Sequence, residues 1–136
     1  MNDLENGIEP KRELVREEFP APIGQLLRLT LTSGELGRAT VEFEATAQHA
    51  NPMGTLHGGV LCDIADAAMG AAYRSALGHG ESFTTLELKI NFLRPVWKAK
   101  LRAEAKLVRS GKLLAWSSAT SSMSGSFWSH APPALA

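Results

Sequence analysis

The sequence predicts an α+β fold in which one long helix packs against a single antiparallel sheet. Residues 58–77 form the only stretch of full helical length, and their side chains are apolar on nearly every side, which is typical of a buried helix. The runs before and after it alternate polar and apolar residues with the period of two expected of strands. A buried helix between such runs indicates one helical layer and one sheet layer.

The segment before this helix is expected to contain a short helix and a hairpin. Residues 10–19 begin with a proline and carry apolar side chains at helical spacing, which favours a short helix. Residues 23–32 and 38–45 alternate and flank a glycine-containing turn, so they are expected to pair as antiparallel strands. A loop over residues 46–56 then leads into the long helix.

Four strands are expected after the long helix, which ends at a glycine-rich turn. Residues 83–93 and 96–108 alternate on either side of a bend. A third strand over residues 113–122 is rich in serine and alanine, which are weak strand formers. The fourth begins at Phe127 and is cut short by a pair of prolines, so the last strand is expected to be truncated.

Length and charge limit the function classes that need to be considered. A chain of 136 residues has the size of one domain, and we expect a tail with a short helix over residues 1–19 and a single domain over residues 20–136. The 14 basic residues balance the 14 acidic ones, so no general attraction to nucleic acid or to an anionic membrane is expected. No run approaches the roughly 18 consecutive apolar residues of a membrane span.

Cysteine and histidine usage points to a protein without a metal. The single cysteine, Cys62, excludes an intramolecular disulfide and is compatible with a reducing cytoplasm, where we expect the protein to be located. The histidines and this cysteine lack the spacing of metal ligands, so we expect neither a metal nor a cofactor.

The start of the long helix carries residues suited to binding a carbonyl oxygen. A helix N-terminus presents unpaired backbone N–H groups, and Gly58 and Gly59 have no side chains to block approach to them. The Gly59 N–H can therefore stabilise the oxyanion that forms when a thioester carbonyl is attacked. His57 could orient the substrate or donate a hydrogen bond, and the amide of Asn51 could position the carbonyl or a water molecule.

Asp66 interrupts the apolar surface of the same helix. Burial of an unpartnered carboxylate is costly, so such a residue is expected to have a partner or a chemical role. A carboxylate can act as a general base on water or can attack the thioester itself, and the sequence leaves both roles open.

The spacing along the helix predicts an assembly. His57 and Asp66 are nine residues apart, which corresponds to roughly 13 Å along the helix axis. Both cannot reach one carbonyl from the same helix. Two antiparallel copies related by a two-fold axis would bring Gly59 of one chain near Asp66 of the other, so a homodimer with sites between its chains is expected.

Two segments resemble the hotdog-fold thioesterases, in particular the group of the phenylacetate-pathway thioesterase and 4-hydroxybenzoyl-CoA thioesterase. The first, residues 51–66, reads NPMGTLHGGVLCDIAD, and the second, residues 84–95, reads TTLELKINFLRP. The specific signal is the combination of an asparagine six residues before the His-Gly-Gly triplet, an acid nine residues after its histidine, and the later segment.

The resemblance implies a long helix wrapped by a curved antiparallel sheet, dimers that often pair into tetramers, and acyl-CoA substrates. It assigns Asp66 as the catalytic carboxylate, Gly59 as the oxyanion donor, and Asn51 and His57 as positioning residues. It also implies substrate contacts at Gly58 and at four further residues. These are the Thr85 hydroxyl near the attacking water, and Arg94, Arg109 and Lys112 near the phosphates of coenzyme A.

Two other functions remain open from the sequence. A hotdog domain can hold an acyl-CoA without hydrolysing it, although retention of Asp66 argues against a purely binding role. A hydratase or dehydratase of the same fold would pair a catalytic histidine with an acid in a different local pattern. The sequence does not identify the acyl group, nor whether coenzyme A or an acyl-carrier protein bears it.

Overall fold

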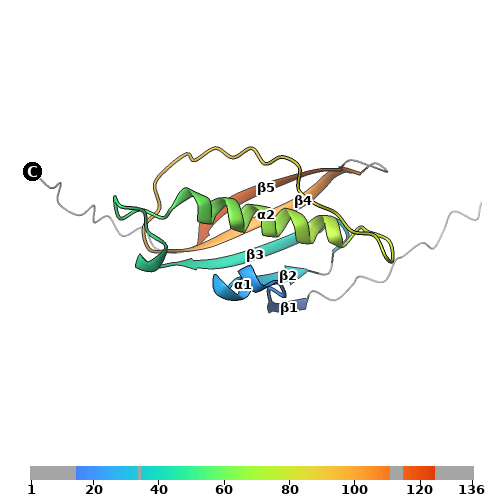
Figure 1. The fold of residues 1–136 in the computed structure, drawn as a ribbon, viewed down its shortest axis with the longest axis horizontal. Helices are drawn as coiled ribbons and strands as arrows, with labels where there is room; N and C mark the ends of the chain where they lie inside the picture. Colours follow the sequence, from blue (N-terminus) through green and yellow to red (C-terminus); the bar gives the residue numbers. More distant parts are fainter. Residues whose placement is uncertain (1–14, 34, 111–114, 125–136) are drawn as a thin grey trace, which may run out of the picture.

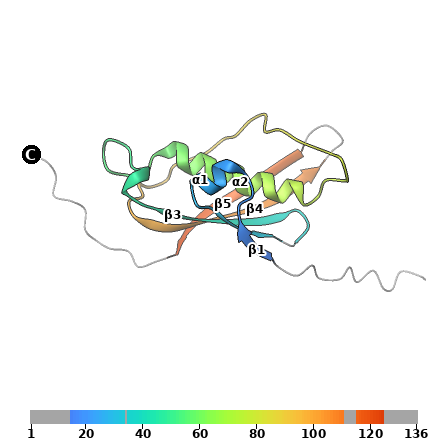
Figure 2. The ribbon, with the colours of Figure 1, turned by 60° about the horizontal axis from the view of Figure 1, so that its bottom comes forward.

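The structure is a computed structural model that describes residues 15–33, 35–110 and 115–124. Within these ranges the chain forms a five-stranded antiparallel sheet with strand order β1-β2-β3-β4-β5. Helix α2 lies along one face of this sheet, and the short helix α1 lies beside it (Figures 1 and 2). The elements are β1 Val15–Glu18, α1 Pro22–Leu26, β2 Thr30–Ser33, β3 Arg38–Ala45, the 3₁₀ turn η1 Ala47–His49, α2 Gly58–Arg74, β4 Ala99–Ser110 and β5 Ala115–Ser124.

Small side chains allow α2 to lie close to the sheet. Its fully buried positions are Ile64, Ala68 and Ala72, which recur every four residues and so form one stripe along the helix. The stripe faces buried residues of strands β3 and β4. Those residues are Val41, Phe43, Leu101, Ala103 and Ala105. The face of α2 opposite to this stripe is therefore directed away from the sheet, and it carries the candidate site.

The sequence predicts the core of the fold correctly. The predicted α+β arrangement is confirmed, and the strand predicted over residues 38–45 is β3, paired with β2 and β4. The serine-rich run also forms a strand, β5, because ten of its residues pair with β4. The strand expected from Phe127 lies outside the described residues.

Two predictions before β3 are wrong in the described part. Residues 15–18, expected in a short helix, form the edge strand β1, where pairing with β2 satisfies the backbone. The strand expected over residues 23–32 begins only at Thr30, because Pro22 starts helix α1. Arg28 ends that helix with a positive φ of 54°, and the Leu29 N–H then donates to the Gly24 carbonyl at 2.8 Å.

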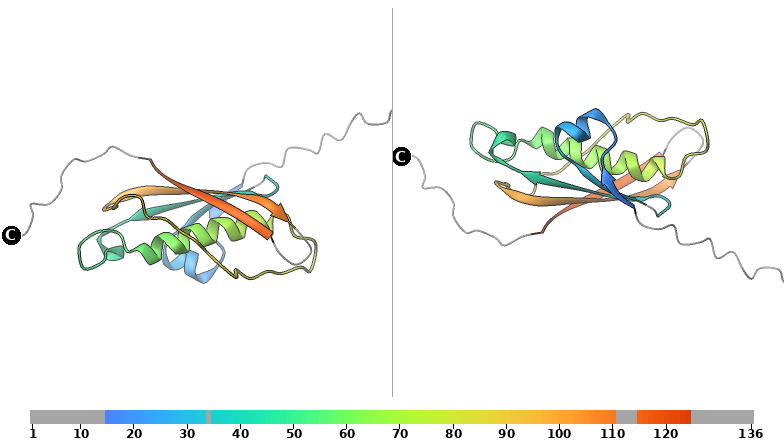
Figure 3. Two further views of the ribbon diagram at one scale, coloured as in Figure 1. Left: turned by 90° about the horizontal axis from the view of Figure 1, so that it is seen from above. Right: turned by 90° about the horizontal axis from the view of Figure 1, so that it is seen from below.

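The strand predicted over residues 83–93 is also absent. Residues 81–98 instead run back along α2, on the side of that helix opposite to α1 (Figures 1 and 3). We call this segment the crossover. The Phe83 ring packs on Tyr73 of α2 at 5.2 Å between ring centroids, whereas several other apolar side chains of the crossover are exposed, among them Leu86 by 77% and Phe92 by 55%. No strand of the described residues pairs with this segment, so its alternation does not produce a strand here.

No helix of the described residues is long and apolar enough to cross a bilayer.

Candidate active site

The His57 side chain caps the N-terminus of α2. Its Nδ1 accepts a hydrogen bond from the Gly59 N–H at 2.9 Å, and its backbone is extended, as an N-cap residue requires. A neutral imidazole that accepts at Nδ1 carries its proton on Nε2. The N–H predicted to bind an oxyanion is therefore paired with an imidazole of the same chain in this structure. The sequence alone does not indicate this contact, because histidine is not among the preferred capping residues.

The amide of Asn51 shapes the loop that leads to this cap. Its Oδ1 accepts from the N–H groups of Met53 and Thr55, at 2.9 and 3.2 Å, and its Nδ2 donates to the Thr55 hydroxyl at 2.8 Å. Gly54 closes the turn with a φ of +82°, which favours glycine. The loop then returns toward η1, where the His57 N–H donates to the carbonyl of the residue that ends η1 at 2.9 Å. Asn51 thus fixes the position of His57 through the loop backbone.

The structure brings two predicted site residues together at the middle of α2. The Thr85 hydroxyl, on the crossover, donates to Asp66 Oδ1 at 2.7 Å. Asp66 is half-buried and Thr85 is exposed, so the carboxylate lies at the surface between α2 and the crossover. One carboxylate oxygen is held by this hydrogen bond.

Gly59 and Asp66 lie on the same face of α2. They are seven residues apart, close to two full turns, so both are directed away from the sheet and are separated by about 10 Å along the axis. A reacting carbonyl must lie about 3 Å from its oxyanion donor and within reach of its base or nucleophile. The two groups of one chain therefore cannot act on the same carbonyl.

A cavity of about 370 Å³ opens beside the first turn of α2. It brings the predicted residues Asn51, Gly58 and Arg94 together with side chains that the sequence analysis did not assign to the site. The full lining is Asn51, Thr55, Leu56, Gly58, Leu61, Phe92, Leu93, Arg94, Pro95 and Val96. Three of the unassigned residues, Phe92, Leu93 and Pro95, belong to the NFLRP segment, and the run that contains this phenylalanine was predicted as a strand.

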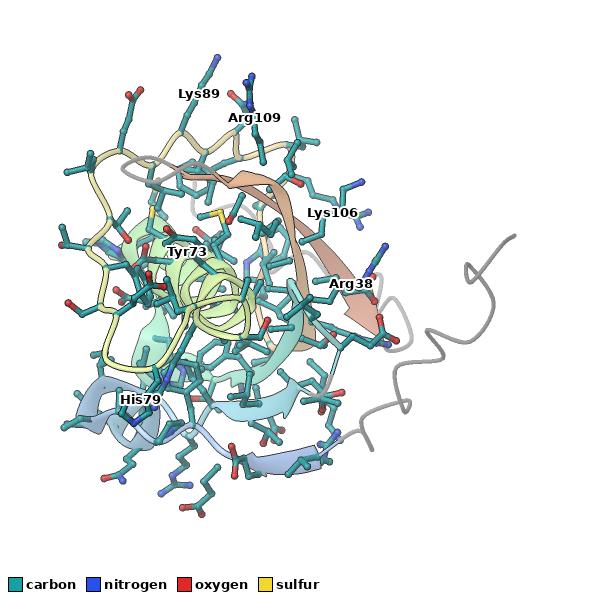
Figure 4. The ribbon with its side chains drawn as sticks, turned by 90° about the vertical axis from the view of Figure 1, so that its right-hand side faces the viewer. Arg38, Tyr73, His79, Lys89, Lys106 and Arg109 are labelled. Atoms are coloured by element: carbon teal, nitrogen blue, oxygen red, sulfur yellow. The ribbon has the colours of Figure 1, made fainter. Side chains whose placement is uncertain are left out.

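The remaining predicted residues lie elsewhere. Arg109 is exposed near the end of β4, and its side chain extends from the same side of the molecule as Lys89 (Figure 4). It does not line the cavity. Lys112 lies outside the described residues. Among the residues that the structure describes, no three His, Cys, Asp or Glu side chains lie close enough to hold a metal ion.

The fold and these residues define a class of protein: a hotdog domain with an acidic residue on its central helix and a glycine pair at the start of that helix. The sequence profile of the thioesterase superfamily matches residues 53–115. The chain is also 30% identical over 107 residues to "Putative esterase SSO1253" of Saccharolobus solfataricus, a match that covers 79% of this chain and 69% of that protein. The chain belongs to the thioesterase superfamily.

Two further similarities agree with this membership. "Putative esterase SSO2140" of the same organism is 34% identical over 89 residues, which cover 65% of this chain and only 63% of that protein. A structure from Ralstonia eutropha JMP134, described as a phenylacetic acid degradation-related protein, superimposes with a TM-score of 0.71 at 26% identity and covers 81% of this chain and 92% of its own. The resemblance to the phenylacetate group is thereby confirmed, and the predicted hydrolase class is supported.

The cap predicts a stability difference between two substitutions of one residue. His57→Ala removes the acceptor of the Gly59 N–H and should lower the free energy of unfolding by about 1 kcal/mol. His57→Asn keeps an acceptor at the N-cap and should remain close to the unsubstituted protein. Urea denaturation measures both, with His79→Ala as a control because His79 is exposed and follows α2. Equal stability of all three variants would contradict the capping role.

Proposed function

We propose that the protein hydrolyses acyl-CoA thioesters to a free acid and coenzyme A. The observation that carries this proposal is the placement of the Asp66 carboxylate, held by Thr85, on the same helix face as the Gly59 N–H. The carboxylate is suited to attack on a carbonyl carbon, and the N–H is suited to stabilising the carbonyl oxygen as it becomes negative. Membership of the thioesterase superfamily supports the same reaction.

Binding of the substrate requires an exchange at the helix N-terminus. The thioester carbonyl replaces the His57 imidazole as the acceptor of the Gly59 N–H, which exchanges one hydrogen bond for another. The displaced imidazole carries its proton on Nε2 and can then donate to the substrate. His57 thus protects the oxyanion donor in the free protein and orients the thioester in the complex.

Asp66 supplies the attack. As a general base it takes a proton from water while the water oxygen bonds to the thioester carbon, and the C–S bond then breaks to release the thiolate of coenzyme A. As a nucleophile it bonds to the thioester carbon while the C–S bond breaks and the thiolate of coenzyme A leaves, and water then hydrolyses the resulting anhydride to the same acid and free Asp66. The hydrogen bond from Thr85 occupies Oδ1 and supports either role by fixing the direction of Oδ2.

The site is completed by a second copy of the chain. Because Gly59 and Asp66 lie about 10 Å apart on one rigid helix, the carbonyl held by one chain meets Asp66 of its partner. Exposed apolar side chains on the crossover support such a contact, since Leu86 is 77% exposed and Trp97 is 45% exposed. We propose a homodimer, with pairing of dimers into a tetramer as in the resembling family.

The carrier part of the substrate is anionic. Arg94 at the cavity, Arg109 at the end of β4, and Lys112 are proposed to contact the phosphates of coenzyme A. An acyl-carrier protein is the alternative donor, and a zero net charge gives it no particular advantage. The single half-buried cysteine agrees with a cytoplasmic location.

The first test separates the two carboxylates of α2. Asp66→Asn keeps the shape of the side chain but removes its base and nucleophile, so thiol release from acyl-CoA should fall at least about a hundredfold. Asp63→Asn is the matched control, because Asp63 is exposed on the same helix and should be dispensable. A folded Asp66→Asn protein with unchanged turnover would contradict the proposal.

The second test concerns Thr85 as a positioning residue. Thr85→Val removes the hydroxyl that orients Asp66, so kcat should fall about tenfold with little change in KM. Thr85→Ser should restore kcat, and Thr84→Val on the neighbouring exposed residue should leave it unaltered. A change in KM alone would assign Thr85 to substrate binding instead.

The third test concerns the shared site. Gly59→Pro removes the oxyanion N–H while remaining compatible with a first helical turn, and like Asp66→Asn it should inactivate a homodimer. A heterodimer with one substitution in each chain keeps one intact site, formed by Gly59 of one chain and Asp66 of the other. Co-expressed with two affinity tags and purified, it should have about half the activity of the unsubstituted dimer. An inactive heterodimer would show that each chain builds its own site.

A further inference from the structure

The cavity beside α2 has walls from three parts of the chain. The loop before the helix, the first turns of α2 and the end of the crossover each contribute lining residues. A hydrogen bond of 2.6 Å from the Leu56 N–H to the Val96 carbonyl ties the loop to the crossover. The Asn51 amide braces the same loop from within. The cavity is therefore built into the backbone of the free chain.

The interior of the cavity suits an apolar group. Leu56 and Val96 are only 6% and 9% exposed, and Leu61 of α2, which also lines the cavity, is half-buried. The two polar side chains of the loop that line the cavity, Asn51 and Thr55, are hydrogen-bonded to one another. An amide placed among these residues would find few free partners and would be costly to bury.

Phe92 lies at the border between this cavity and the helix start. Its ring comes within 3.1 Å of the position that a Cβ on Gly58 would occupy, so the glycine makes room for the ring. The same ring lines the cavity and is 55% exposed. More than half of this aromatic side chain is thus uncovered at the cavity, where a bound apolar group would cover it.

We propose that this cavity binds the apolar acyl group of the thioester and that Phe92 determines which acyl groups fit. The inference rests on the proposed function, because a carbonyl at the Gly59 N–H lies one residue from Gly58, which lines the cavity. The alternative occupant, the pantetheine arm of coenzyme A, carries two amides that this lining does not satisfy. Arg94 is exposed at the mouth and remains available for the anionic part of the substrate.

A chain-length profile tests the role of Phe92. Phe92→Ala deepens the cavity, so the ratio of kcat/KM for octanoyl-CoA to that for butanoyl-CoA should rise at least about tenfold. Met53→Ala is the matched control, because Met53 is 81% exposed on the loop before α2 and does not line the cavity. The ratio of the two kcat/KM values should stay unchanged in this variant. An unchanged ratio in Phe92→Ala would overturn the proposal, whether kcat/KM stays the same for both substrates or falls equally for both. The equal loss would assign the cavity to the pantetheine arm.

A binding measurement separates this inference from the proposed function. The S-octyl and S-butyl thioethers of coenzyme A cannot be hydrolysed, and calorimetry gives their affinities without turnover. The ratio of the two affinities should change in Phe92→Ala and not in Met53→Ala. Absence of thiol release with a changed affinity ratio would reject hydrolysis and keep the acyl cavity. Thiol release with unchanged ratios in both measurements would keep hydrolysis and reject the cavity.

Discussion

The spacing imposed by one rigid helix governs the rest of the candidate site. Helix α2 holds the Gly59 N–H and the Asp66 carboxylate on one face and two turns apart, about 10 Å along its axis. The two groups are too far apart to reach the same carbonyl. Side-chain motion does not close this gap, because the Gly59 N–H belongs to the backbone of the rigid helix. The reaction proposed above therefore needs a second helix that runs past the first, and this spacing is the reason for proposing an assembly.

The packing of α2 explains why that face is available. The alanines of the buried stripe let the helix lie against β3 and β4, so the polar residues of the helix need not enter the core. The crossover then lies over part of the outward face and supplies the Thr85 hydroxyl to Asp66. A side chain that would be costly to bury alone is instead held at a surface that a partner chain can cover.

The limits of sequence-based prediction follow from the physics of each segment. The helix and the strands β3 and β4 could be predicted because their periodicity reflects burial against one layer. The crossover could not, since its apolar residues alternate as those of a strand do, although Leu86 and Phe92 stay exposed in the structure. The edge strand β1 was missed because all four of its residues are exposed, so no pattern marks it. Asp66 and Gly59 were identifiable from their motif, whereas Phe92 and the Thr85–Asp66 hydrogen bond depend on contacts between segments far apart in sequence.

The cap at His57 connects the stability of the free protein to binding. A helix that begins with two glycines offers unprotected N–H groups, and an internal imidazole satisfies one of them until a carbonyl arrives. In the proposed reaction the substrate gains only the difference between two hydrogen bonds, so the carbonyl alone contributes little to affinity in the ground state. The oxyanion of the transition state is a stronger acceptor than either the imidazole or the carbonyl, and the same N–H therefore stabilises it preferentially. In the proposed reaction, affinity for the substrate would then come from the acyl group and the anionic carrier, with specificity at the cavity beside Gly58 and catalysis at the helix N-terminus.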